Sequence, residues 1–296
     1  MQNFYVLYSN SESEHTQDSL LTQIQNIFTQ ENRLGSWTQM TDDTNPFFWA
    51  KRLGRQIPDT TADSAVVLVI GSATLLTEVI NGLIAAKRTY QLPIAHLQFP
   101  TTIEPEATNQ PNPLITQSQS LLQVKQSHTQ YLAHVVGALP QKSDRYFLNR
   151  LTVGISLDLF ESKLPVKGNL LNQFFSWWRW LEQFNLQTSF PTYLGLKNRY
   201  LSHRKTLTFT LTNHPDSGKI TALIVDKMNF IGMFLAFWQL QRQKAPAQVH
   251  GFEETEVSAM TTVHIADIQT AMADEKRLGT GTFAFTVDSY AYPFWS

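Results

Sequence analysis

The chain has 296 residues, a formal net charge of -1 and no cysteine. This charge gives no general attraction to nucleic acid or anionic lipid, and without cysteine there is neither a disulfide framework nor a thiolate metal site. No apolar run reaches the roughly 18 residues of a membrane-spanning helix. The N-terminus lacks a basic region and a long apolar core, so we expect no signal peptide and a cytoplasmic protein.

The first 130 residues predict strands that alternate with helices, which is typical of a doubly wound, mostly parallel sheet. The pattern predicts strands at residues 4–8, 34–40, 66–70 and 93–99. Apolar positions at helical spacing predict helices between them, at residues 20–28, 45–53 and 74–83. Asn45 and Pro46 have the character of an N-cap and a first helical residue, and Gly54 and Pro58 are expected to close that helix. The proline-rich residues 101–113 predict a surface loop.

The most informative stretch is residues 66–83, which predicts a strand, a tight turn and a helix. Residues 66–70 are all apolar, as in a strand that is buried on both faces. Gly71 and Ser72 follow where the strand would turn. Such a turn aims backbone N–H groups and a helix N-terminus at one point, which suits an anion. The same pattern also fits an ordinary turn without a ligand, so both interpretations stay open at this point.

From residue 131 onward the pattern changes to strands with few helices, which predicts a second, mainly antiparallel domain. These strands are predicted at residues 131–139, 146–157, 205–212, 219–226, 249–256, 259–266 and 282–288. Residues 213–218 contain Pro, Asp and Gly and predict a hairpin turn.

Two apolar segments are candidates for contact with a lipid. Residues 172–185 carry a helical stripe of aromatic and aliphatic side chains that most simply predicts a core-facing helix, and Trp180 lies off that stripe as a candidate for a membrane interface or a partner. Residues 228–240 are too short to span a bilayer. They could line an acyl-chain groove, but we expect a buried element there.

Residues 71–83 resemble the GGDGTLxEVxNGL signature of the diacylglycerol kinase family, within the wider superfamily of lipid kinases and NAD kinases. With the two aligned on Glu78, the matching residues are Gly71, Leu76, Glu78, Val79, Asn81, Gly82 and Leu83. The GGDGT half differs: its second glycine, aspartate, third glycine and threonine are replaced by Ser72, Ala73, Thr74 and Leu75. A polar turn at residues 9–13 takes the place of the family's phosphate-binding NPxSG loop.

Shorter matches follow in family order along the rest of the chain. The family's GTGND-like loop aligns with residues 100–104, where Thr101 matches and Glu104 stands for the aspartate. Its FxNxxxxGFDA segment is similar to this chain around Asp158, and its C-terminal DGE aligns at Asp288. Each of these carboxylates also fits a plain solvated or turn-forming role.

The resemblance implies a nucleotide-binding α/β domain at residues 1–130 and a two-layer, β-sandwich-like lipid domain at residues 131–288. It also implies that residues 289–296 return to the first domain. The implied activity is transfer of the ATP γ-phosphoryl group to a lipid hydroxyl with the help of Mg²⁺. The implied cofactor-binding residues are Gly71, Ser72, Ala73, Thr74, Glu78 and Thr101, with Asp158 and Asp288 as catalytic carboxylates and Glu104 as a metal ligand.

The altered turn favours weak or lost activity. Glycines let a backbone approach phosphate, and Mg²⁺ needs carboxylates. Ser72 and Thr74 each add a Cβ, and Ala73 lacks a carboxylate. Two functions therefore stay open: an ATP- and Mg²⁺-dependent lipid kinase with unusual loops, or a non-catalytic relative that binds a lipid, a nucleotide or a protein. The partner that the resemblance favours is a lipid substrate or ligand, with a peripheral contact at the inner membrane surface, and we expect no nucleic acid.

Overall fold

The computed structural model describes residues 2–9, 14–41, 43–99, 112–138, 144–155, 188–197, 199–241 and 246–296. The protein has a mixed α/β fold with much antiparallel sheet, in agreement with the prediction. The chain divides into two compact units. Unit 1 comprises Met1–Gln130 and Ala291–Ser296, and unit 2 comprises Tyr131–Tyr290.

Unit 1 contains parallel strands in the order β2-β1-β3-β4. They are β1 (Asn3–Tyr8), β2 (Leu34–Gln39), β3 (Ala65–Ile70) and β4 (Ile94–Leu97). Every residue of β3 is buried, which confirms the prediction of a strand covered on both faces. The register pairs Tyr8 with Ile70 and Ile70 with Leu97, so these strands end together at one edge.

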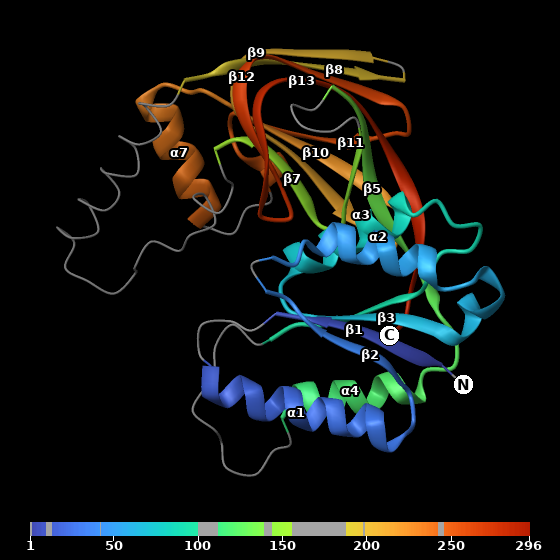
Figure 1. The fold of residues 1–296 in the computed structure, drawn as a ribbon. Coiled ribbons are helices and arrows are strands. Elements are labelled where there is room, and N and C mark those ends of the chain that lie inside the picture. Colours follow the sequence, from blue (N-terminus) through green and yellow to red (C-terminus); the bar gives the residue numbers. More distant parts are fainter. Residues whose placement is uncertain are drawn as a thin grey trace, which may run out of the picture. The chain divides into compact units, whose positions relative to one another are not determined.

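Helices cover both faces of this sheet (Figure 1). On one face lie α1 (Glu14–Gln30) and α4 (Pro113–Gln123), whose apolar residues share a core with β1 and β3. On the other face lie α2 (Pro46–Gln56) and α3 (Ala73–Ala85), and the short 3-10 helix η1 (Asp59–Ser64) leads into β3. The core residues that α1 and α4 contribute are Leu21, Ile24, Phe28, Leu114 and Leu121.

The two predicted ends of α2 have different outcomes. Asn45 is the N-cap, because its side-chain oxygen accepts a hydrogen bond from the Phe48 N–H at 3.3 Å. The helix passes Gly54, the first of the two residues expected to close it, and continues to Gln56, shortly before the second, Pro58. Gly54 lies against α3, where an added Cβ would come within 2.8 Å of the Ala86 Cβ. Close helix packing, rather than a turn, therefore explains this glycine.

The C-terminal residues are held in unit 1 by hydrogen bonds to its own strands and helices. The Trp295 indole N–H donates to the Leu121 carbonyl at 3.0 Å, and its backbone N–H donates to the Ile94 carbonyl at 2.8 Å. The Tyr292 hydroxyl donates to the Leu92 carbonyl at 3.0 Å. Since Trp295 is also part of the core between α1, α4 and the sheet, this segment contributes to the stability of unit 1.

Unit 2 is mainly antiparallel, as predicted. Its strands are β5 (His128–Ala138), β6 (Asp144–Phe147), β7 (Arg150–Gly154), β8 (Phe190–Leu196), β9 (Arg199–His214), β10 (Lys219–Asp226), β11 (Phe252–Val257), β12 (Thr261–Ala273) and β13 (Lys276–Phe294). The first residues of β5 and the last residues of β13 belong to unit 1. The predicted hairpin joins β9 to β10. β9 and β12 are long enough for each to pair with both β7 and β8. Where two layers were expected, these strands form a closed, barrel-like sheet.

The helix α7 (Phe230–Gln241) packs beside these strands and precedes the 3-10 helix η2 (Pro246–Gln248) (Figure 1). Met233 and Ala236 are buried against Leu207 and Val225. A second face of α7 leaves large apolar side chains exposed, namely Phe230, Ile231, Phe234, Leu235 and Trp238. The prediction of a buried element at residues 228–240 is therefore wrong for this face.

Among the residues that the structure describes, no helix has both the length and the hydrophobicity needed to cross a membrane.

A buried carboxylate holds the turn between β6 and β7. Asp274 accepts hydrogen bonds from the backbone N–H groups of Leu148, Asn149 and Arg150 at 2.7, 2.9 and 2.9 Å.

We expect Asp274→Asn to lower the free energy of unfolding by about 3 kcal/mol, because a neutral amide weakens these charge-assisted bonds and places an N–H against a donor. Chemical denaturation measures this loss. The neighbouring Glu275→Gln is the matched control, with a change of about 0.5 kcal/mol or less, and equal effects would refute the assigned role of Asp274.

A second ionic cluster makes the stability of unit 2 depend on pH. His203 of β9 contacts Asp226 at 2.8 Å through Nδ1 and Glu253 at 3.3 Å through Nε2. The hydrogen bond to Asp226 is the main cause that raises the pKa of His203, against an opposing effect of burial. The stabilisation is therefore fully present below the unfolded pKa of about 6.5 and disappears as the pH rises through the higher folded pKa.

We expect the free energy of unfolding to fall by about 1 kcal/mol across this pH window, because both carboxylates are partly exposed and solvent screens them. Denaturation of the parent and of His203→Gln at a series of pH values measures this contribution. The variant should lack the decrease, and a decrease of the same size in the variant would assign it to other groups.

Candidate functional site

The candidate site is the edge at which β1, β3 and β4 end. β1 lies between β2 and β3, so the chain leaves it in one direction and later continues on its other side. In open sheets of this kind, ligands bind outside the carboxyl ends of the strands at such a switch point. The backbone N–H of Ser9 donates to the Ile70 carbonyl at 3.1 Å, and that of Gly71 donates to the Leu97 carbonyl at 3.0 Å. The segments that follow β1, β3 and β4 are thereby held together.

Gly71 occupies a position that only glycine fits. Its φ is +153°, and an added Cβ would lie 2.7 Å from the Ser9 Oγ and 3.0 Å from a Leu75 methyl carbon. The glycine therefore allows the turn after β3 to approach the segment after β1. This close approach is what a phosphate-binding edge needs, although it also serves a turn without a ligand.

The three residues after Gly71 begin α3, as the sequence predicts. Ser72 is the N-cap, and its Oγ accepts a hydrogen bond from the Leu75 N–H at 3.2 Å. Ala73 and Thr74 form the first helical positions and are half-buried. The helix N-terminus thus satisfies one of its own N–H groups with a side chain, and the turn carries no carboxylate. The backbone of this edge fits an anion, whereas the turn does not fit Mg²⁺.

His96 supports the turn from β4. Burial lowers the pKa of His96, and its bond to the Gly71 carbonyl opposes this only in part. The side chain is therefore neutral at pH 7, and its Nε2–H donates to the Gly71 carbonyl at 2.9 Å. His96 is therefore a packed residue that also helps to position the turn after β3.

The second half of the signature lies in the interior of unit 1. Glu78 is only 4% exposed, and Val79, Asn81, Gly82 and Leu83 are buried as well. The Asn81 side-chain N–H donates to the Thr77 carbonyl at 2.8 Å. An added Cβ at Gly82 would collide with the Phe47 carbonyl oxygen of α2. These matching residues therefore let α2 and α3 pack closely, whatever further role Glu78 has.

Asp288 belongs to unit 2, near the end of β13. His134 of β5 is paired with Tyr146 of β6, with parallel rings 4.0 Å apart, and Tyr290 contacts Tyr146 edge-on. Burial lowers the pKa of His134, while Asp144 and Asp288 oppose this in part. Burial, together with Tyr290 and Asp144, raises the pKa of Tyr146 to about 12. Neither ring is therefore charged at pH 7.

This cluster could not be predicted from the sequence. His134, Tyr146 and Asp288 come from strands whose pairing a single sequence does not specify. Each residue alone fits the alternating pattern of a half-exposed strand. Cross-strand pairing brings them together.

The remaining predicted residues lie outside the described ranges. Thr101, Glu104 and Asp158 belong to this group, as does the aromatic segment at residues 172–185 with Trp180. Within the described ranges, no group of three or more His, Asp or Glu side chains is placed to hold a metal ion. The roles proposed for Thr101, Glu104 and Asp158 therefore stay predictions.

No protein-family model matches the chain, and no curated protein matches its sequence. The fold is similar to solved structures from Bacillus anthracis str. Sterne. One is described as a diacylglycerol kinase, at 10% sequence identity and a TM-score of 0.61, with 99% of this chain and 96% of that chain covered. A second is provisionally identified as a diacylglycerol kinase, at 11% identity and a TM-score of 0.59, with 99% and 97% covered. At such identities the likeness shows the fold.

Proposed function

We propose that this is a diacylglycerol kinase-like protein that binds lipid and in which phosphoryl transfer from ATP is weak or lost. The full-length similarity of fold supports the family, and the motif at residues 71–83 supports it independently. The observation that carries the loss of activity is the turn after β3. It keeps the glycine and the helix N-terminus but has Ala73 at the position of the family's aspartate.

Phosphoryl transfer depends on charge stabilisation, which this turn supplies poorly. The developing charge is normally neutralised by metal ions that carboxylates hold, and the attacking hydroxyl needs a base. Ala73 can do neither. Glu78, five residues further along α3, is buried. The altered turn therefore supports binding of an anion more readily than catalysis on it.

The exposed face of α7 supports the lipid part of the proposal. At about 100° per residue, Phe230, Ile231, Phe234, Leu235 and Trp238 fall within an arc of about 140°. Ile231 is 68% exposed and Leu235 is 42% exposed. The helix contains no charged residue. Contiguous exposed apolar side chains with aromatic residues among them are typical of a surface that meets a membrane or a partner.

Sedimentation with vesicles tests the lipid part of the proposal. The purified protein is mixed with phosphatidylcholine vesicles that contain diacylglycerol and is then centrifuged. We expect the protein to sediment with the vesicles at both low and high salt, because a net charge of -1 leaves hydrophobic burial as the main attraction. Protein that stays in the supernatant at all vesicle concentrations would refute lipid binding.

An active ATP- and Mg²⁺-dependent kinase is the second candidate. The backbone hydrogen bonds between the strand ends and the positive φ of Gly71 favour an active kinase, since both leave the edge suited to a phosphate. In that case the carboxylates would come from the other predicted positions, Glu104, Asp158 and Asp288. Direct measurement of phosphoryl transfer distinguishes the two candidates.

A further inference from the structure

The net charge of -1 conceals a local excess of positive charge in unit 2. Residues 190–214, which form β8, the turn after it and β9, contain Lys197, Arg199, Arg204 and Lys205 but no Asp or Glu. All four of these basic residues are exposed. This pair of strands is therefore a basic surface in a protein that is slightly negative as a whole.

The basic surface ends beside α7. The Lys227 backbone N–H donates to the Lys205 carbonyl at 2.6 Å, and α7 begins three residues after Lys227, at Phe230. Leu207, two positions further along β9, belongs to the apolar cluster against which the buried side of α7 packs. β9 therefore passes under α7 immediately after Lys205, and the exposed side chains of Arg204 and Lys205 lie near the first turn of the helix.

The charges of Arg204 and Lys205 are available to a ligand. Within the part of the chain that the structure describes, neither residue has an ion-pair partner. The nearby carboxylates of β10 and β11, Asp226 and Glu253, both contact His203 instead. A negatively charged group that approached Arg204 and Lys205 would therefore displace no existing salt bridge.

An exposed apolar helix face with Lys or Arg beside it fits the surface of a negatively charged bilayer. The apolar side chains enter the boundary between head groups and acyl chains, and the long basic side chains reach the phosphates. We propose that α7, together with Arg204 and Lys205, binds the surface of an anionic bilayer. This proposal rests on the lipid-binding role of α7 proposed above and adds the charge that the lipid carries.

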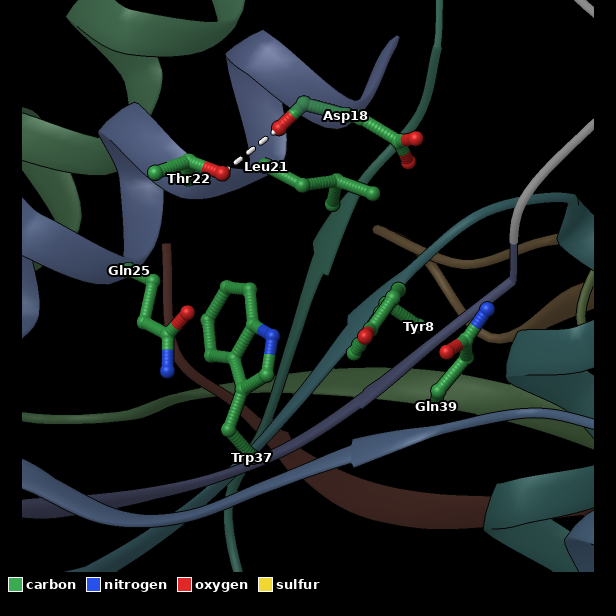
Figure 2. A pocket seen from close by; sticks show the side chains of 7 residues that line it. All are labelled: Tyr8, Asp18, Leu21, Thr22, Gln25, Trp37 and Gln39. Carbon is green, nitrogen blue, oxygen red and sulfur yellow. Dashed lines mark hydrogen bonds between the residues drawn. The ribbon is translucent and has the colours of Figure 1, made fainter. Parts of the chain in front are cut away.

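The pocket in unit 1 offers no comparable site for an acidic head group. It has a volume of about 250 Å³ and lies between α1 and the ends of β1 and β2. Figure 2 shows Tyr8 and Trp37 on the sheet side, with Asp18 and Thr22 contributed by α1. The lining contains no Lys, Arg or His. A phosphate there would meet the like charge of Asp18 and no cation.

Sedimentation with neutral and acidic vesicles tests the proposal. The purified full chain is mixed with phosphatidylcholine vesicles that contain diacylglycerol, and with vesicles in which part of the phosphatidylcholine is replaced by phosphatidylglycerol. We expect about tenfold tighter binding to the acidic vesicles at low salt, because each Lys or Arg near an anionic surface adds attraction. At high salt the difference should fall to about twofold or less.

A matched pair of variants assigns this preference to β9. Arg204→Gln/Lys205→Gln should reduce the preference for acidic vesicles from about tenfold to about twofold and leave the affinity for neutral vesicles unchanged. Arg52→Gln/Arg55→Gln removes the same charge from exposed positions of α2 and should keep the full preference. All four side chains are exposed, so both variants should fold.

The outcomes separate this proposal from the lipid-binding role itself. Binding to neutral and acidic vesicles with equal affinity would overturn the proposal alone, whereas no binding to either kind would refute both. Equal loss of the preference in the two double variants would assign it to net charge and would also overturn the proposal. Release from acidic vesicles by millimolar inorganic phosphate at constant ionic strength would point to a site for free phosphate. Tighter binding of single-stranded oligothymidylate than of acidic vesicles would assign the basic surface to nucleic acid.

Discussion

The double variant Ile231→Glu/Leu235→Glu is expected to lose about 100-fold or more of its affinity for diacylglycerol-containing vesicles. Burial of one aliphatic side chain of this size in an apolar phase is worth about 1.5–3 kcal/mol. Two such contributions disappear in the variant, and two carboxylates would have to enter or approach the hydrocarbon region. Vesicle sedimentation at a series of lipid concentrations measures the change. Both side chains are exposed, so folding should be retained.

The control for this prediction carries the same change of charge elsewhere on unit 2. Tyr200 and Met260 are 66% and 73% exposed, and neither belongs to α7. The double variant Tyr200→Glu/Met260→Glu should keep the affinity of the parent within about twofold. If both double variants lose binding equally, general repulsion rather than α7 governs the interaction. If neither loses binding, α7 is not the lipid-contacting element.

The sequence predicts the core of unit 1 well because its signal is local. A run of buried β-branched residues followed by glycine and a helical stripe specifies β3, the turn and α3 without knowledge of the rest of the chain. Asn45 and Pro46 specify the start of α2 in the same way. The continuation of α2 beyond Gly54 could not be predicted, since Gly54 is explained by its contact with α3 and not by its own sequence neighbours.

Other elements lack such a local signal. The helix α4 has many Gln, Ser and Thr residues and follows a proline-rich segment, so its few apolar positions do not stand out. The helix α7 is apolar around its circumference, and a sequence of that kind cannot show which face is covered. The barrel-like closure of unit 2 depends on long strands with two partners each, and pairing between distant strands leaves no local trace.

The candidate site is predicted only as far as the motif extends. The turn at Gly71 and the helix that follows it agree with the sequence analysis, because glycine after an apolar strand has a direct physical meaning, whereas the N-cap role of Ser72 comes from the structure. The structure adds that the well-matched half of the motif packs α3 against α2. The supporting contacts of Ser9 and His96 come from the ends of other strands. A single sequence could not show these contacts.

The triple variant Ser72→Gly/Ala73→Asp/Thr74→Gly rebuilds the GGDG pattern and is expected to bind Mg·ATP more tightly than the parent. It removes two Cβ atoms from the edge and restores the missing carboxylate, while the Ser→Gly change at the N-cap costs only a few tenths of a kcal/mol. Calorimetric titration of both proteins with Mg·ATP measures the difference. If neither protein binds Mg·ATP, the edge does not admit a nucleotide, and only the lipid-binding role is left.

The most direct test is the transfer of labelled γ-phosphate from ATP to diacylglycerol by the purified parent protein in the presence of Mg²⁺. Loss of a group that stabilises the transition state or accepts a proton lowers the rate by about 10²–10⁴-fold. We therefore expect the parent to incorporate no more label than a protein-free blank, or only slightly more, under conditions in which it sediments with vesicles. Sustained turnover of the parent, at rates typical of a kinase, would contradict the account and show that other carboxylates replace the one missing at Ala73.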